Sequence, residues 1–222
     1  MKLFITGTDT EVGKTYITIG LLRAFKQRQL TTLGVKPISS GCIEKNGQLI
    51  NPDVQLLRDN ATIHLPFADI NPFAFVPAIA PHIAAQQVNQ PLTVAGLIEK
   101  THSVLECPAD VTLIEGVGGW CVPLNQQETM ADWVKALGLK TLLVVGMRLG
   151  CLNHALLTYR AIQASQVPLV GWIANCSDRD FSFQEENINT LKQWLKAPYR
   201  GTVTYHGLPE ESIDISGLMG IL

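Results

Sequence analysis

The first fifteen residues constrain the fold more than any other part of the chain. A short apolar run from Lys2 to Thr6 leads into Gly7-Thr-Asp-Thr-Glu-Val-Gly-Lys14-Thr15, and apolar residues at helical spacing follow at once. A strand, a glycine-bounded loop ending in Gly-Lys-Thr and a helix are the context in which a phosphate-binding loop is credible. The first glycine stands one residue before its usual place, which Thr8 occupies. The alternative, a strand-to-helix turn with a surface lysine, explains the flanking elements less well.

A loop of this kind surrounds phosphate oxygens with backbone N–H groups and with the positive end of the following helix. In that arrangement Lys14 would reach the β- and γ-phosphates of a nucleotide, and the Thr15 hydroxyl would bind Mg²⁺. The opening of the chain therefore predicts a nucleotide site.

Apolar runs of strand length alternate with helical patterns along most of the chain. The predicted strands are residues 3–6, 33–36, 111–115, 141–146 and 169–175, and the predicted helices include residues 131–137, 154–165 and 187–196. Buried parallel strands are rich in β-branched residues and lack polar alternation, as these runs do. We therefore predict an α/β fold, a P-loop NTPase-like parallel sheet with helices on both faces, in one domain spanning residues 1–222.

Composition excludes several classes of function. The formal net charge is −2 and the basic residues are scattered, so no basic stripe predicts nucleic-acid binding. The chain has neither a signal-peptide pattern nor an apolar run of membrane-spanning length, and we expect a cytoplasmic protein with no membrane partner. The five cysteines are widely spaced without a Cys-x-x-Cys pair, which favours neither a disulfide framework nor a zinc site.

Residues 66–81 interrupt the alternation of strands and helices. The segment holds four prolines and three phenylalanines with little periodicity, and it reads as a rigid extended loop. Pro81 is expected in the first turn of the helix that carries residues 82–87. The loop either covers a site or packs on the surface, and the pattern is equally compatible with both.

Polar groups follow the predicted strands at their carboxyl ends, where ligands bind in open parallel sheets. Glu115 precedes a glycine-rich run and is predicted as an acidic Mg²⁺ ligand rather than a solvated glutamate. Lys36 would supply a second cation for a transferred phosphoryl group, with a structural, snorkelling lysine as the alternative. Asp53 could be a functional acidic residue at the site, or an aspartate that is favoured only by the dipole at a helix start. The sequence supports both interpretations equally. Asn175 either reads an adenine edge or closes its strand by turn propensity.

The ordered set of motifs resembles the dethiobiotin synthetase family from Leu3 to about Asn175. The matching stretches are Gly7 to Thr15, Lys36-Pro with Ser40-Gly41, Asp53, Pro81-His82, Glu115-Gly-x-Gly-Gly-Trp120, and Gly150-Cys-Leu-Asn-His154. The resemblance implies an ATP-dependent cyclo-ligase of biotin biosynthesis that acts on 7,8-diaminononanoate and CO₂. It would work through a carbamate and a carbamic–phosphoric anhydride, would need Mg²⁺, and would release dethiobiotin, ADP and phosphate.

The resemblance also implies roles for the residues that match the family's motifs. The catalytic residues would be Lys14 and Lys36, and the Mg²⁺ ligands would be Thr15, Asp53 and Glu115. The substrate-binding residues would be Thr10, Ser40, Gly150, Cys151 and Asn153. The residues that contact the nucleotide would be Glu11, Val12, Gly13, Lys14, Thr15, Tyr16, Asp53, Glu115, Gly116, Val117, Gly118, Asn175, Cys176, Thr204, Tyr205, His206 and Glu210.

The family is a homodimer in which the partner subunit holds the substrate carboxylate, so the resemblance implies sites at a dimer interface. The loop from Gly150 to Asn153 matches the region that does this, and backbone amides at a helix start suit a carboxylate. Two positions depart from the family pattern. Asn187 stands where a tyrosine helps to hold the carboxylate, so that contact is not expected here, and Thr204 stands where the base-binding stretch often begins with proline.

Three other functions compete with a ligase. A switching ATPase of the MinD or ParA type carries a signature lysine early in the loop, where this chain has Asp9, and it often has a membrane-targeting tail or a basic face. A small-molecule kinase would release a phosphorylated product. A nucleotide-binding module without activity would not need two acidic Mg²⁺ candidates.

Overall fold

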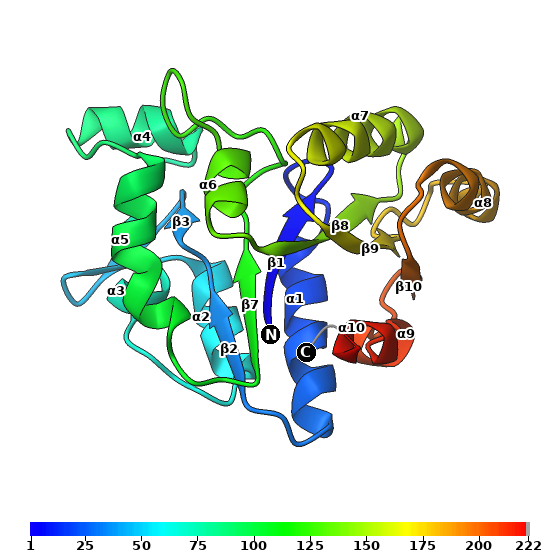
Figure 1. Cartoon of the computed structure of the whole chain (residues 1–222), viewed down its shortest axis with the longest axis horizontal. Helices are drawn as coiled ribbons and strands as arrows, with labels where there is room; N and C mark the ends of the chain where they lie inside the picture. Colours follow the sequence, from blue (N-terminus) through cyan, green and yellow to red (C-terminus); the bar gives the residue numbers. More distant parts are fainter. Residues whose placement is uncertain (221–222) are drawn as a thin grey trace.

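A six-stranded parallel sheet forms the centre of the computed structural model, which describes residues 1–220 (Figure 1). Its strand order is β10-β9-β8-β1-β7-β2, and each neighbouring pair runs parallel. The strands are β1 (Lys2–Gly7), β2 (Thr32–Val35), β7 (Val111–Glu115), β8 (Lys140–Gly146), β9 (Leu169–Asn175) and β10 (Tyr199–Val203). This arrangement confirms the predicted fold class.

Helices cover both faces of the sheet because successive strand residues point to opposite sides. Leu3 and Ile5 pack in the same buried cluster as the apolar side chains of α1, whereas Phe4 packs on the other face against Trp120 and Trp133. The helices are α1 (Lys14–Gln27), α2 (Pro52–Asn60), α3 (Phe67–Ile70), α4 (Pro81–Gln87), α5 (Val94–Leu105), α6 (Met130–Ala136), α7 (Cys151–Ala164), α8 (Gln184–Trp194), α9 (Pro209–Ser212) and α10 (Ser216–Met219).

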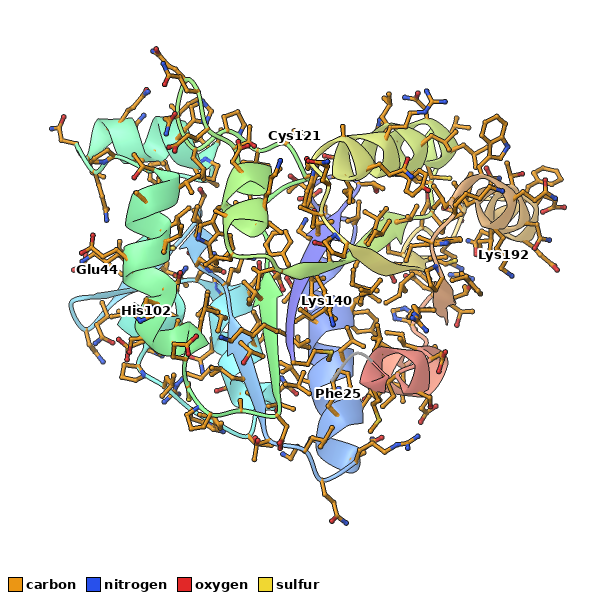
Figure 2. The ribbon with its side chains drawn as sticks, in the orientation of Figure 1. Phe25, Glu44, His102, Cys121, Lys140 and Lys192 are labelled. Atoms are coloured by element: carbon orange, nitrogen blue, oxygen red, sulfur yellow. The ribbon has the colours of Figure 1, made fainter. Side chains whose placement is uncertain are left out.

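Two small sheets lie outside the central one. Strands β3 (Ile38–Ser39) and β6 (Phe73–Ala74) pair in parallel, and β4 (Ile43–Lys45) and β5 (Gln48–Ile50) form a hairpin. Figure 2 shows Glu44 of this hairpin at the outer left side of the molecule. The prediction of a plain extended loop over residues 66–81 was wrong, since the segment contains α3 and β6. Its prolines lie outside the paired positions, so Phe73, which lies between Pro72 and Pro77, can pair in β6.

The predicted strands and helices lie where the sequence places them, with shifts at their ends. Strand β2 ends at Val35, because the Lys36 N–H donates to the carbonyl of Ile70 rather than to the central sheet. Helix α7 begins at Cys151, three residues before the prediction, and Pro81 opens α4 as expected. The single domain over residues 1–222 remains an expectation, and its last two positions lie outside the described residues.

Strand β10 was not predicted. It lies at the edge of the sheet, four of its five residues are only partly buried, and Gly201 interrupts its pattern. Across residues 1–220, none of the helices combines the length and the apolar character needed to cross a bilayer.

Candidate active site

The loop between β1 and α1 has the backbone conformation that its glycines allow. Gly13 caps α1 with a φ of 87°, in the left-handed region, and its carbonyl accepts the first helical hydrogen bond from Ile17 N at 3.0 Å. A Cβ atom at Gly13 would lie 2.1 Å from Asn175 Nδ2, so a larger residue cannot stand there. The Asn175 side chain, 3% exposed, in turn donates from Nδ2 to the Val12 carbonyl at 2.9 Å. The end of β9 thus holds the loop in place.

Lys14 lies under this loop and is 7% exposed. Its Nζ donates to the Asp9 carbonyl at 2.9 Å. Burial lowers the pKa of Lys14 to about 8; the charge of Glu115 opposes this shift and that of Lys36 adds to it. The ammonium is charged at neutral pH, but none of the ion pairs among residues 1–220 involves it. A phosphate group at the loop would provide one.

A cluster of charged groups joins the carboxyl ends of β2 and β7. Glu115 is 0% exposed, and its Oε1 accepts from Lys36 Nζ at 2.7 Å and from Thr15 Oγ1 at 2.8 Å. Lys36 Nζ also donates to Asp53 Oδ2. Burial alone would lower the pKa of Lys36, but the Glu115 and Asp53 carboxylates outweigh it and hold the pKa above its usual value. Asp53 lies in the first turn of α2, so it both suits the helix dipole and faces the cluster.

The donor set of this cluster fits Mg²⁺, which prefers hard oxygen ligands and keeps some water and phosphate oxygens. Thr15 and the two carboxylates supply such oxygens. Glu115 Oε2 is buried and has no hydrogen-bond partner within residues 1–220. A buried carboxylate oxygen without a partner is costly, and a bound cation would satisfy it. Thr15, Asp53 and Glu115 are therefore the residues that would hold the metal.

A cavity of about 780 Å³ extends from the phosphate loop across this cluster. The predicted site residues that line it are Thr10, Glu11, Gly13, Lys14, Thr15, Lys36, Ser40, Asp53, Glu115, Gly116, Val117 and Gly118. Cys121, in the loop that follows β7, lies above the central sheet in Figure 2, on the side toward which the arrows of β1, β2 and β7 point in Figure 1. The structure thus brings the phosphate-binding and acidic candidates together with two of the substrate-binding candidates, Thr10 and Ser40.

The far end of this cavity combines a hydroxyl with apolar walls. Ser40 Oγ is buried and has no hydrogen-bond partner among the described residues. Ala78, Ile79 and Ala80, from the proline-rich segment, line the same cavity. Of the two interpretations that the sequence left open, the structure therefore supports the one in which this segment covers the site.

A second cavity of about 220 Å³ adjoins the loop and shares Gly13 with the first. The predicted residues lining it are Gly13, Tyr16, Asn175, Cys176, Thr204, Tyr205 and His206. The Tyr16 hydroxyl donates to the Gly207 carbonyl at 2.8 Å, which ties α1 to this wall. Because Asn175 Nδ2 already donates to Val12, its Oδ1 is the atom left to accept a hydrogen bond from a ligand. Burial raises the pKa of the Cys176 thiol to about 11, so it stays protonated.

Five predicted residues do not line either cavity. Val12 is buried, and its side chain packs beside Gly7 and Gly146, so only its backbone faces the loop. The Glu210 carboxylate pairs with Arg23 at 3.3 Å on the outside of α1. The remaining three, Gly150, Cys151 and Asn153, lie at the start of α7 and away from the cavity of their own chain.

Two site residues were missed by the sequence analysis. Asn51 lines the large cavity and caps α2, and Asn71 donates to the Lys36 carbonyl at 2.6 Å. An Asn-Pro-Asp sequence is a helix-start signal, so the capping role of Asn51 was predictable. Nothing local in the sequence indicates the contact of Asn71, which spans 35 residues.

Comparison with known proteins finds ATP-dependent dethiobiotin synthetases among the relatives of this chain. A family model described as an AAA domain matches residues 1–208. The chain is 40% identical to the ATP-dependent dethiobiotin synthetase BioD of Aeromonas hydrophila over 220 residues, which cover 99% of this chain and 97% of that protein. It is 49% identical to the BioD protein of Cellvibrio japonicus over 200 residues, covering 90% and 87% of the two chains. It is 45% identical to that of Nitrosospira multiformis over 218 residues, covering 98% and 94%.

Similar solved structures share the fold at low sequence identity. MinD in the MinC:MinD complex of Aquifex aeolicus superposes with a TM-score of 0.57 at 13% identity, covering 92% of this chain and 81% of that chain. Chloroplast FtsY of Physcomitrella patens superposes with a TM-score of 0.53 at 16% identity, covering 99% of this chain but only 64% of that one. These similarities establish the fold and nothing beyond it.

The lowered pKa of Lys14 leads to a prediction about pH. If a bound triphosphate raises this pKa again, binding above pH 8 takes up a proton. Nucleotide affinity should then fall by up to about tenfold per pH unit above pH 8. Titration calorimetry between neutral and alkaline pH, in buffers of different ionisation enthalpy, measures both the affinity and the proton uptake.

Lys14→Arg is the matched control, because a guanidinium does not titrate in this range. Its affinity is expected to be lower but independent of pH. A parallel decline in both proteins would assign the titration to another group.

Proposed function

The chain belongs to the family of ATP-dependent dethiobiotin synthetases, and on that premise we propose that it closes the ureido ring of dethiobiotin. CO₂ is inserted between the two amines of 7,8-diaminononanoate while ATP is split to ADP and phosphate. One observation carries the proposal: the phosphate loop, the Lys36–Glu115 cluster and Ser40 share a single cavity. A phosphoryl donor and an organic acceptor fit there side by side, which ATP hydrolysis alone would not require.

The proposed reaction has three steps. One amine attacks CO₂ and loses a proton, which forms a carbamate. A carbamate oxygen then attacks the γ-phosphorus of ATP, and the bond between this phosphorus and the bridging oxygen breaks. ADP departs, and the product is a carbamic–phosphoric anhydride. The second amine attacks the carbonyl carbon, expels phosphate and loses a proton as the ring closes.

The residues around the phosphate end stabilise charge during the transfer. Lys14 and Lys36 are fixed cations beside the position of the γ-phosphoryl group, and fixed charges of this kind favour the transition state. A Mg²⁺ ion held by Thr15, Asp53 and Glu115 would neutralise charge on the phosphate oxygens. The loop amides from Glu11 to Tyr16 and those from Gly116 to Gly118 surround the phosphates.

The base of the nucleotide and the organic substrate meet distinct surroundings. At the base end, the free Oδ1 of Asn175 suits the amino group of adenine, between Tyr16 and the Thr204–His206 stretch. At the substrate end, the Thr10 and Ser40 hydroxyls face the amines or the carbamate. The apolar walls from Ala78 to Ala80 suit an aliphatic chain.

A homodimer with shared sites completes the proposal. Gly150, Cys151 and Asn153 do not reach the cavity of their own chain. Beside them Leu149 is 92% exposed, and Leu157 on α7 is exposed as well, so the start of α7 presents an apolar surface. Gly150 caps α7 in the left-handed conformation; the Cys151 amide donates to the Arg148 carbonyl, and the next amides in the first turn of this 14-residue helix suit a carboxylate. We assign these amides and the Asn153 side chain to the carboxylate of the substrate in the partner's cavity.

The first prediction concerns the requirements of the reaction. Purified protein should form dethiobiotin, detected by mass, only when ATP, Mg²⁺, bicarbonate and 7,8-diaminononanoate are all present. Phosphate release should depend equally on the diamine. Phosphate release that ignores the diamine would contradict the proposal and favour a switching ATPase. A phosphorylated diamine as the end product would instead indicate a kinase.

The second prediction concerns Lys36. Loss of one preorganised cation at a phosphoryl group lowers kcat by at least about 100-fold, so Lys36→Gln should do the same. Affinity for ATP should fall less, since Lys14 and the loop amides remain. The substitution also breaks a buried ion pair, so kcat is measured well below the melting temperature of the variant.

Two variants separate catalysis from folding at this position. Lys36→Arg keeps the charge and the ion pair and is expected to restore the melting temperature more than kcat. Lys2→Gln breaks an exposed ion pair of the same 2.7 Å length with Glu106 and should change neither value. Near-normal turnover and an unchanged melting temperature in Lys36→Gln would make Lys36 a bystander.

The third prediction tests the shared sites. Lys14→Ala and Asn153→Ala subunits should each be nearly inactive alone. An equal mixture of exchanging subunits should recover about a quarter of the wild-type activity, because half of the dimers carry one intact composite site. Subunit exchange is verified by native mass spectrometry of differently tagged chains. No recovery after verified exchange would place each site within one subunit.

A further inference from the structure

The segment from Lys36 to Ser40 carries two groups of the proposed site but belongs to neither the central sheet nor a helix. It leaves β2 after Val35, pairs briefly with β6 through Ile38 and Ser39, and ends at Gly41, whose φ is 73°. Backbone hydrogen bonds to residues 70–77 hold the segment along one side, and side-chain contacts from elsewhere add to them at Lys36 and Ser40.

Asn51 supplies one of these contacts. It is 5% exposed, lines the cavity, and caps α2 by accepting a hydrogen bond at Oδ1 from Asp53 N at 3.0 Å. Its Nδ2 donates to the Ser40 carbonyl, also at 3.0 Å. A single side chain thus joins the residue with the unpartnered hydroxyl to the helix turn that carries Asp53.

Asn71 holds the other end of the segment in the same manner. It is buried, its Nδ2 donates to the Lys36 carbonyl at 2.6 Å, and its Oδ1 accepts from Ser39 Oγ at 2.8 Å. Asn71 and the ion pairs thus fix Lys36, and backbone bonds to residues 75–77 hold Ser39 and Gly41. At Ser40 itself, the Asn51 bond holds the carbonyl.

We propose that Asn51 is a positioning residue that holds Ser40 toward the diamine and fixes the position of Ser40 relative to Asp53. The inference rests on the proposed function, since it assigns the Ser40 hydroxyl to the diamine or its carbamate. Without the Nδ2 donor the Ser40 carbonyl loses its partner and the hydroxyl is free to turn away. Binding of the diamine should then weaken, while ATP continues to meet an unchanged phosphate loop.

Asn51→Ser tests this with little disturbance of α2. Serine is an equally good N-cap, so the bond to Asp53 N is kept, but its short side chain cannot donate to the Ser40 carbonyl. Loss of one hydrogen bond corresponds to a rise of about 5- to 10-fold in KM for the diamine. The KM for ATP should stay within about twofold, because the loop contacts are intact.

The chain offers a matched control in the same helix. Asn60 ends α2, its Nδ2 donates to the Leu56 carbonyl at 2.8 Å, and its Oδ1 accepts from Arg23. Asn60→Ser therefore removes the same kinds of contact far from the cavity. It should leave both KM values unchanged, whatever its effect on the melting temperature.

A double-mutant cycle shows whether Asn51 acts through Ser40. Ser40→Ala alone should raise the KM for the diamine, and adding Asn51→Ser should raise it no further. Equal effects of Asn51→Ser in both backgrounds would overturn the proposal in favour of a general structural role. An unchanged KM in Asn51→Ser, or in Ser40→Ala, would overturn it as well.

Hydrogen exchange keeps the inference separable from the proposed function. Amides of residues 38–42 should exchange about tenfold faster in Asn51→Ser and at the wild-type rate in Asn60→Ser. If the wild-type protein forms no dethiobiotin, the proposed function fails, and the exchange data still decide whether Asn51 holds this segment. Unchanged exchange would show that it does not.

Discussion

The buried pair of Glu115 and Lys36 is the interaction on which the site depends. Glu115 ends a central strand with no exposure to solvent, where a buried charged group is costly unless it is paired. Lys36 provides the partner from the end of the neighbouring strand. Removing either group would leave a buried charge, at a cost of about 3–5 kcal/mol. The cation that we propose for the phosphoryl group is therefore also needed by the fold.

Close backbone approach is the second constraint at this edge of the sheet. A Cβ at Gly116 would lie 2.6 Å from Phe4 Cζ, and one at Gly13 would overlap the Asn175 amide. The phosphate loop and the loop after β7 can line one cavity because these positions carry no side chain. The backbone N–H groups of such glycine-rich loops suit a polyanion.

The features that sequence analysis could predict are those encoded locally. The phosphate loop, the buried strands from 111 to 115 and from 169 to 175, and the polar residues at their ends all show in short windows of sequence. Strand β10 was missed because a partly exposed edge strand carries little apolar pattern. The Asn71 contact, and the coverage of the cavity by the proline-rich segment, depend on residues far apart in the chain. No local pattern encodes such contacts.

Asn175 and Lys36 show why these long-range contacts matter for chemistry. Asn175 joins the base cavity to the phosphate loop through Val12, and Lys36 joins the loop's Thr15 to Asp53 through Glu115. Neither side chain can reorient freely, since each is already held by hydrogen bonds to protein partners. Groups fixed in this way need little reorganisation when charge develops on a phosphoryl group, which is the condition under which electrostatic catalysis is strongest. In the proposed reaction, the rigidity set by folding would thus be the source of the catalytic advantage.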